Sequence, residues 1–386
     1  MHPFVFDTTA KIVFRAGATA DIGAIMGGRL GRRILFVTDT SIRRLKLCQP
    51  CLDALSDNGS TVVVFDAVEP DPSLATVLQA VEAGRQASVT GVVGFGGGSS
   101  LDVAKVAALL LGSRQDIDNA WGVGNAVGPR LPLVLVPTTA GTGSEVTPIS
   151  IITIEGTEKR GISSPVILPD AAILDPDLTL GLPPHITAAT GIDAMVHAIE
   201  AYASTNANNN LLSQMLARQA LQLLGRNLEK AVFEGSNRAA RGAMLLGSML
   251  AGQAFANSPV AAVHALAYPI GARFHVPHGL SNVLVLPHVL RFNAPNAGSA
   301  YAAIARDAFP DIEADTSAEA LCTAFIARLA VLPERLGLPA RLRDVGICEN
   351  DLMVLARDAM KQTRLLVNNP RDVTEQDAYD IYRAAW

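Results

Sequence analysis

Short apolar runs alternate with amphipathic stretches through the first half of the chain. Each run is rich in Val, Ile and Leu and lacks the alternating polar positions of a half-exposed strand. Helical periods separate the runs, as in Ser73–Arg85 and Leu101–Leu111. Strands that are buried on both faces and joined through helices are typical of a parallel sheet, so this half predicts a doubly wound, Rossmann-like α/β domain. The four predicted strands are Ile34–Thr38, Thr61–Phe65, Gly91–Phe95 and Leu133–Pro137.

The pattern changes near residue 180. Strand-like runs become scarce after this point and helical periods dominate. Pro183 and Pro184 mark the change, and Thr187 or Thr190 is a candidate cap for the helix that follows. We therefore expect a dinucleotide-binding α/β domain at residues 1–180 and an all-helical, metal-binding domain at residues 181–386. The clearest helical stretches of the second part are Leu211–Leu224, Arg238–Phe255, Ala318–Leu332 and Asp351–Lys361.

Composition narrows the class of protein. The 386 residues are enough for two domains, and only 17% of them are charged, against about 25% in an average protein. The net charge of −5 comes without a basic run, so neither a nucleic acid nor a membrane is an expected partner. Four cysteines with a single CxxC, Cys48 and Cys51, do not make a disulfide framework. With no apolar signal segment at the N-terminus, we expect a cytoplasmic protein.

A glycine-rich segment follows the third predicted strand. Gly96, Gly97 and Gly98 are succeeded by Ser99 and by a helical stretch, in the sequence GGGSSLDVAK. Glycines let backbone N–H groups approach an anion, and a helix N-terminus adds partial positive charge. A phosphate or pyrophosphate is therefore the expected ligand, although the segment is neither GxGxxG nor a Walker motif and a tight turn between strand and helix is the alternative.

A hydroxyl-rich loop follows the fourth predicted strand. Its sequence, PTTAGTGSEVT at residues 137–147, offers hydroxyl and amide groups with little bulk, which suits a nucleotide. Asp39 follows the first predicted strand, where an acid can accept from the ribose 2′-OH of NAD and repel a 2′-phosphate, or can simply cap a helix. Loops at the carboxyl ends of strands in one parallel sheet predict a shared ligand crevice.

Histidines and one carboxylate form the most specific pattern. Asp193 and His197 are four residues apart in a helical stretch and so share one face. His264, His275 and His278 then fall in one short segment, although the whole chain has only 7 histidines. One carboxylate with several imidazoles suits Fe(II), Zn(II) or a similar transition metal rather than Ca(II) or Mg(II). A single histidine is more often a hydrogen-bonded core residue, but the set predicts a metal site.

Together these segments resemble the iron-containing (group III) alcohol dehydrogenase family over nearly the whole chain. Besides the two loops above, the matching pieces are ILPDAAILDPDLT (167–179), TAATGIDAMVHAIEAY (187–202), HALAYPIGARFHVPHGLSN (264–282), LPHVLRFN (286–293) and NNPRDVT (368–374). The resemblance implies the two-domain fold read above, with NAD and iron as cofactors, zinc being an alternative metal. It also implies a homodimer or a higher homo-oligomer.

The resemblance also assigns residues. The four family ligands fall on Asp193, His197, His264 and His278. His264 and His278 are also candidate catalytic side chains, as are Tyr268, which stands where family members often have a second histidine, and His275, which has no ligand counterpart. Asp71 stands where many members carry Asn. The expected cofactor-binding residues are Asp39, Asp71, Gly97, Gly98, Ser99, Asp102, Thr138, Thr139, Thr142, Thr147, Lys159 and Leu178.

The expected activity is hydride transfer between NAD(H) and a small primary alcohol or aldehyde at a metal. Two other activities of the same scaffold stay open, those of a maleylacetate reductase and of a hydroxyacid–oxoacid transhydrogenase. A glycerol-dehydrogenase-like zinc enzyme fits less well, because that relative generally lacks the full ligand set. A protein that binds the metal or nucleotide without catalysis is the alternative from a different class.

Overall fold

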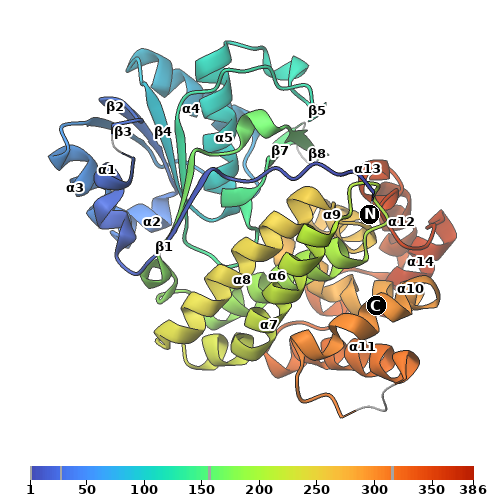
Figure 1. Ribbon diagram of the computed structural model, residues 1–386. Coiled ribbons are helices and arrows are strands. Elements are labelled where there is room, and N and C mark those ends of the chain that lie inside the picture. Colours follow the sequence, from blue (N-terminus) through green and yellow to red (C-terminus); the bar gives the residue numbers. More distant parts are fainter. Residues whose placement is uncertain (1, 27, 155–157, 314–316) are drawn as a thin grey trace. The chain divides into compact units, whose positions relative to one another are not determined.

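The computed structural model describes residues 2–26, 28–154, 158–313 and 317–386 (Figure 1). The chain divides into two compact units. One is Asp7–Leu180, and the other is Gly181–Trp386 together with Met1–Phe6. The N-terminal residues group with the second unit because Val5 and Asn208 exchange two hydrogen bonds of 2.9 Å, one from the Val5 N–H and one from the Asn208 amide.

The first unit is built on a six-stranded sheet in the order β1-β9-β6-β4-β2-β3, with every neighbouring pair parallel. The four predicted strands are present as β2, β3, β4 and β6, which confirms the parallel α/β class. β1 and β9 were not predicted. The strands are β1 (Lys11–Phe14), β2 (Arg33–Val37), β3 (Thr61–Phe65), β4 (Gly91–Gly96), β6 (Leu133–Pro137) and β9 (Ala171–Leu174).

Helices cover both faces of this sheet. Successive residues of a strand point to opposite sides, so each strand contributes side chains to both layers of helices. In β2, Leu35 and Val37 pack into one buried cluster with residues of α4 (Leu74–Gln86) and α5 (Gly98–Ser113). Ile34 and Phe36 pack into the other cluster, which includes residues of α1 (Ile22–Met26) and α3 (Gln49–Asp57). Between β2 and α3 lies the short helix α2 (Thr40–Arg44). The two apolar faces of each strand explain why the runs lacked polar alternation.

A small second sheet completes the first unit. Its order is β5-β8-β7, with β5 at Gly122–Val123, β7 at Ile149–Ile154 and β8 at Glu158–Ser163. β7 and β8 pair antiparallel, and Lys159 of β8 lies opposite Thr153. The sequence did not predict this sheet, since EKRGIS has no apolar run.

The described part of residues 181–386 contains helices and no β-strand, in agreement with the predicted all-helical class. None of the described helices has the length and apolar character needed to cross a membrane. The main helices are α6 (Pro184–Ala203), α7 (Leu211–Phe233), α8 (Arg238–Asn257), α9 (Ala262–Phe274), α10 (His278–Ala308), α11 (Ala318–Arg335), α12 (Leu352–Ala359), α13 (Thr363–Leu366) and α14 (Glu375–Ala385).

The expected cap of α6 was wrong. The helix begins at Pro184 with Pro183 at the N-cap, and both threonines lie inside it. The Thr187 hydroxyl donates to the Pro183 carbonyl and the Thr190 hydroxyl to the Ile186 carbonyl. Proline fits the first helical position because its φ is already helical and its missing N–H has no partner there, so no hydroxyl cap is required.

Helices α7 and α10 approach closely near the end of α10. A Cβ atom built on Gly225 of α7 would overlap the backbone carbonyl of Ala308, the last residue of α10. The position accepts only a hydrogen as its side chain, so Gly225 is a requirement of helix packing.

Candidate metal centre

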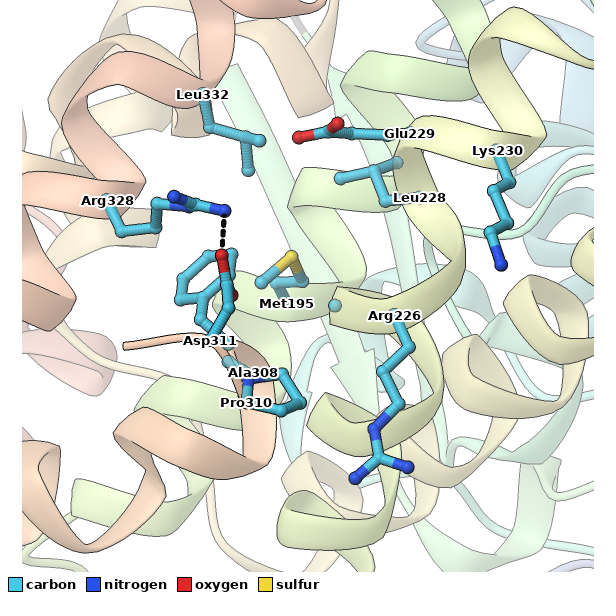
Figure 2. A pocket seen from close by; sticks show the side chains of 12 residues that line it. Met195, Arg226, Leu228, Glu229, Lys230, Ala308, Pro310, Asp311, Arg328 and Leu332 are labelled. Atoms are coloured by element: carbon cyan, nitrogen blue, oxygen red, sulfur yellow. Dashed lines mark hydrogen bonds and ion pairs between the residues drawn. The ribbon is translucent and has the colours of Figure 1, made fainter. Parts of the chain in front are cut away.

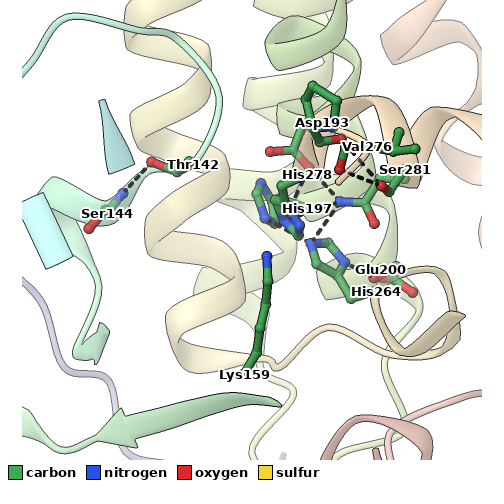
Figure 3. A network of polar contacts seen from close by, with 12 residues as sticks. Thr142, Ser144, Lys159, Asp193, His197, Glu200, His264, Val276, His278 and Ser281 are labelled. Carbon is green, nitrogen blue, oxygen red and sulfur yellow. Dashed lines mark hydrogen bonds and ion pairs between the residues drawn. The ribbon is translucent and has the colours of Figure 1, made fainter. Parts of the chain in front are cut away.

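Four side chains of the helical unit converge on one point (Figure 3). Asp193 and His197 come from the middle of α6, His264 from the first turn of α9, and His278 is the first residue of α10. Their candidate ligand atoms all lie within 4.8 Å of one another. The structure therefore brings together the four residues expected to hold a metal.

The geometry of the cluster follows from local structure. The spacing of Asp193 and His197 places both on one face of α6. The Nε2 atoms of His197 and His264 are 3.0 Å apart, and His278 Nε2 is 3.8 Å from Asp193 Oδ1. The imidazole of His197 also stacks on Phe255 of α8, with ring centroids 4.4 Å apart, so an apolar wall restricts its rotation.

The charge state of the carboxylate suits a ligand. Burial by itself would raise the pKa of Asp193, but His197, His278 and His264, together with a hydrogen bond from Asn282, outweigh it and lower the pKa below its ordinary value. Asp193 is thus a buried anion at neutral pH. A buried anion beside three imidazoles is an arrangement that a divalent cation stabilises.

Two further residues touch the cluster and were missed in the sequence. Asn282 donates from its amide to Asp193 Oδ1 at 2.6 Å, and its own Oδ1 is buried without a hydrogen-bond partner. Glu200 accepts from His264 Nδ1 at 2.6 Å. Each stands one turn after a predicted ligand, Glu200 after His197 and Asn282 after His278. That spacing is the signal that could have found them.

The donor set fits a transition metal. It offers three imidazole nitrogens and one ionised carboxylate, which are the ligands that Fe(II) and Zn(II) accept. The unpartnered Oδ1 of Asn282 is a further buried acceptor beside these atoms. The residues present can therefore hold the metal that the sequence predicted.

Tyr268 and His275, the other two candidate catalytic residues, differ in their position relative to the cluster. The ring of Tyr268 on α9 is 5.9 Å from the ring of His278. His275 is exposed at the C-terminal cap of α9, with a left-handed φ of 54°, and stands outside the four-residue cluster. Of the two, only Tyr268 contacts a side chain of the cluster.

A pocket of about 230 Å³ in the helical unit lies apart from the cluster (Figure 2). It reaches Met195 of α6, which is two residues after Asp193 and so points to the other side of the helix. On its wall Arg328 donates to Asp311 at 2.7 Å. The functional argument therefore rests on the metal cluster and not on this pocket.

In the sheet unit, the two predicted nucleotide loops follow neighbouring strands. β4 ends at Gly96 and β6 at Pro137, and the Thr138 N–H donates to the Gly96 carbonyl at 2.9 Å. Gly97 caps α5 without a side-chain hydrogen bond, so the first N–H groups of this helix have no side-chain cap. Gly98 and Ser99 form the first turn of α5. This is the arrangement that binds anions at a helix N-terminus.

The glycine-rich segment and the hydroxyl-rich loop pack closely against each other. A Cβ atom on Gly98 would stand 2.8 Å from Thr142, and one on Gly97 would stand 3.7 Å from Thr139. Gly96 has a φ of 149°, which side chains rarely adopt, and a Cβ there would lie 3.6 Å from Asp39 Oδ2. The structure thus brings Asp39 and the two loops to one edge of the sheet.

Asp39 has one of the two roles considered for it, that of a helix cap. Its Oδ1 accepts from the Ile42 N–H at 2.9 Å and so caps α2. Its Oδ2 faces the strand end at Gly96. Capping therefore occupies one oxygen, and a contact of the other with the ribose stays a prediction.

Two expected cofactor residues, Asp102 and Thr147, also make hydrogen bonds within the fold. Asp102 accepts from the Ser144 hydroxyl at 2.6 Å and from the Ile151 N–H at 2.9 Å. Thr147 accepts at 3.2 Å from Lys105, which is fully buried and also donates to Ser144 at 2.8 Å. The sequence missed Lys105. These contacts hold the hydroxyl-rich loop against α5, so Asp102 and Thr147 help to fix the position of the loop.

The remaining expected cofactor residues are Asp71, Lys159 and Leu178. Lys159 donates to Asp71 Oδ1 at 2.6 Å, and Asp71 has a left-handed φ of 53°, which Asp tolerates. The ion pair joins the turn before α4 to β8. Leu178 is buried in the core cluster on one face of the sheet.

Glu145 is expected to make the stability of the sheet unit depend on pH. Burial raises its pKa to about 7, from an ordinary 4.5. Between these values the folded protein keeps a proton that the unfolded chain has lost, so stability falls as pH rises through this window. We expect the free energy of unfolding to fall by about 1–3 kcal/mol more in the unchanged protein than in Glu145→Gln when chemical denaturation at pH 5 and 7.5 is compared. Equal pH dependence in both proteins would contradict this.

The comparisons with known proteins agree with the geometry. The family model described as "Iron-containing alcohol dehydrogenase" matches residues 9–176, and that described as "Fe-containing alcohol dehydrogenase family, C-terminal" matches residues 187–386. Long-chain-alcohol dehydrogenase 1 of Geobacillus thermodenitrificans (strain NG80-2) is 42% identical over 364 residues, which cover 93% of this chain and 91% of that protein.

Solved structures show the same fold. A crystal structure of 1,3-propanediol oxidoreductase superimposes with a TM-score of 0.95 at 35% identity and covers 100% of both chains. Sulfoacetaldehyde reductase from Bifidobacterium kashiwanohense, solved in complex with NAD⁺, gives a TM-score of 0.87 at 30% identity and covers 100% of this chain and 99% of that chain. The resemblance read from the motifs is confirmed, and the chain belongs to the iron-containing alcohol dehydrogenase family.

Proposed function

We propose that this protein transfers a hydride between NAD(H) and a small primary alcohol or aldehyde in a metal-dependent reaction. The observation that carries the proposal is the convergence of Asp193, His197, His264 and His278 within 4.8 Å. These are the side chains that would hold Fe(II), and the same set accepts Zn(II). A bound divalent cation supplies Lewis acidity, which polarises the oxygen of the alcohol or aldehyde.

The protein's own residues supply the rest of the site. Asp193 contributes the negative charge, and Phe255 restricts the ring of His197. Tyr268, next to His278, is our candidate for moving the alcohol proton, and His275, at the C-terminal cap of α9, is a second candidate. Asp193, His197 and His264 are buried, which strengthens their electrostatic interactions, whereas His278 is partly exposed.

We propose that the sheet unit binds NAD through its two loops. The N-terminus of α5 at Gly97, Gly98 and Ser99 would receive the pyrophosphate. Thr138, Thr139 and Thr142 lie on the packed loop beside it, and Lys159, held by Asp71, is the proposed ribose contact. Asp102 and Thr147 support this loop from within the fold.

Cofactor preference is expected to follow the charge of Asp39. Asp39→Asn keeps an oxygen that caps α2 but removes the anion that repels a 2′-phosphate. We expect the ratio of kcat/KM for NADP⁺ to that for NAD⁺ to rise at least about tenfold. Asp39→Gly should shift the ratio in the same direction and lose only about 0.3 kcal/mol of stability, because glycine is itself a tolerated N-cap residue. If the unchanged protein uses both cofactors equally, the proposed role of Asp39 is wrong.

The proposed activity is tested directly by following NADH absorbance with purified protein loaded with Fe(II) or Zn(II) and a panel of small alcohols and aldehydes. We expect turnover of short primary alcohols and their aldehydes. A maleylacetate-reductase-like protein would prefer maleylacetate, and a transhydrogenase would exchange hydride between a hydroxyacid and an oxoacid without net NADH formation. Binding of NADH, seen by its fluorescence, with no turnover of any substrate would identify the non-catalytic alternative.

We further propose that the protein forms a homodimer or a higher homo-oligomer and is located in the cytoplasm. The family resemblance supports the assembly, and the low cysteine content supports a reducing compartment. Light scattering coupled to size-exclusion chromatography tests the assembly, and fractionation of the source cells tests the location.

A further inference from the structure

One buried carboxylate next to the metal cluster has no assigned role. Glu200 lies on α6, three residues after His197, and is 6% exposed. Both of its oxygens are used. Oε1 accepts from the backbone N–H of Val263 at 2.7 Å, and Oε2 is 2.6 Å from Nδ1 of His264.

The contact with His264 selects the tautomer of that ring. An ionised carboxylate can only accept, so the proton of a neutral His264 lies on Nδ1. The lone pair is then on Nε2, which is the atom that faces His197 Nε2 at 3.0 Å inside the cluster. A proton on Nε2 instead would point into the cluster and block coordination by His264.

The contact with Val263 fixes the helix that carries this ring. α9 begins at Ala262, and its N-cap residue, Ala261, makes no side-chain hydrogen bond. The first N–H groups of a helix need acceptors, and a negative charge there also interacts favourably with the helix dipole. Glu200 therefore supplies from another helix the cap that the local sequence lacks.

We propose that Glu200 is a positioning residue for the metal site: it holds the first turn of α9 and makes His264 a metal ligand through Nε2. The inference rests on the proposed function, because that function makes His264 a ligand. The carboxylate acts through His264 and contacts neither the metal nor the substrate.

Glu200→Gln tests this role with almost no change in volume. If the glutamine oxygen continues to accept from Val263, its NH₂ group faces His264 Nδ1 and can only donate to it. His264 must then carry its proton on Nε2. We expect a 10–100-fold loss of affinity for Zn(II), measured by competition with a chromophoric chelator, since outer partners of metal ligands have effects of this size. Glu200→Asp, which keeps the acid, should recover part of the affinity.

Asp307→Asn is the matched control. Asp307 is a buried acid of the same unit, and it accepts from Arg218 at 2.6 Å and Gln222 at 2.7 Å. We expect this variant to bind Zn(II) as the unchanged protein does. An equal loss of affinity in Asp307→Asn and Glu200→Gln would show a general effect of buried acids and overturn the proposal.

A second readout needs no metal. The ¹⁵N chemical shifts of the His264 ring, recorded on histidine-labelled, metal-free protein and assigned by comparison with His264→Gln, distinguish the two tautomers. We expect a proton on Nδ1 in the unchanged protein and on Nε2 in Glu200→Gln. The same tautomer in both, with equal Zn(II) affinity, would overturn the role of Glu200. If the unchanged protein binds no divalent cation, the proposed function fails, and the ring shifts still decide whether Glu200 sets the tautomer.

Discussion

Replacement of Asp193 by alanine is expected to abolish metal binding and to lower kcat/KM at least about 1000-fold. The side chain is the single carboxylate in a cluster of three imidazoles, and its pKa is held low by them. Its removal leaves neutral ligands only, which hold a divalent cation less well. A Lewis acid contributes several kcal/mol to catalysis, and a loss of about 4 kcal/mol lowers the rate by a factor of about 1000. Metal content measured by mass spectrometry and NADH kinetics together check the expectation.

Asp358→Ala is a suitable control for this experiment. Asp358 is a partly buried acid of the same unit, and its partners are Arg273 and Lys361. The control should keep both its metal and most of its activity. Full turnover of Asp193→Ala with unchanged metal content would refute the proposed mechanism.

The second large effect concerns stability. Gly225→Ala is expected to destabilise the helical unit by about 3 kcal/mol or more, because its new methyl group would overlap the backbone carbonyl of Ala308 and one of two long helices must move. Urea denaturation followed by circular dichroism measures the change.

A second helical glycine provides the comparison. A methyl group on Gly298 of α10 meets only the sulfur of Cys322, at an ordinary 3.7 Å. Alanine is the better helix former, so Gly298→Ala should leave the stability unchanged or raise it by up to about 1 kcal/mol. Similar destabilisation by the two substitutions would mean that the contact with Ala308 is not the cause.

The sequence predicted the parts of the fold that depend on local pattern. β2, β4 and β6 lie inside the sheet, so both of their faces are apolar, and the edge strand β3 is evident because its sequence, TVVVF, is itself an apolar run. β1 is an edge strand with partly exposed residues, and β8 is polar and pairs through its backbone with β7. β1 pairs with β9, which is remote in sequence, and the polar residues of β8 do not form the apolar run by which a strand is recognised.

For the candidate site, too, the sequence revealed the features that depend on local spacing and missed the contacts between distant residues. The spacing of Asp193 and His197 is a helical property and could be read directly. Glu200 meets His264 across 64 positions, and Lys105 meets Thr147 across 42. Such partners are chosen by tertiary packing, so the motifs did not reveal that Asp102 and Thr147 also hold the loop, and their contact with the cofactor stays a prediction.

The candidate metal ligands come from three different helices, α6, α9 and α10, and this arrangement links cation supply to folding. An ion that binds only the assembled site shifts the equilibrium toward the native state by mass action. At a free concentration one hundred times the dissociation constant, the gain is about 2.7 kcal/mol. Removal of the metal by a chelator should therefore lower the melting temperature of the helical unit as well as the activity of the protein. The metal content of a preparation then has to be known whenever its thermal stability is measured.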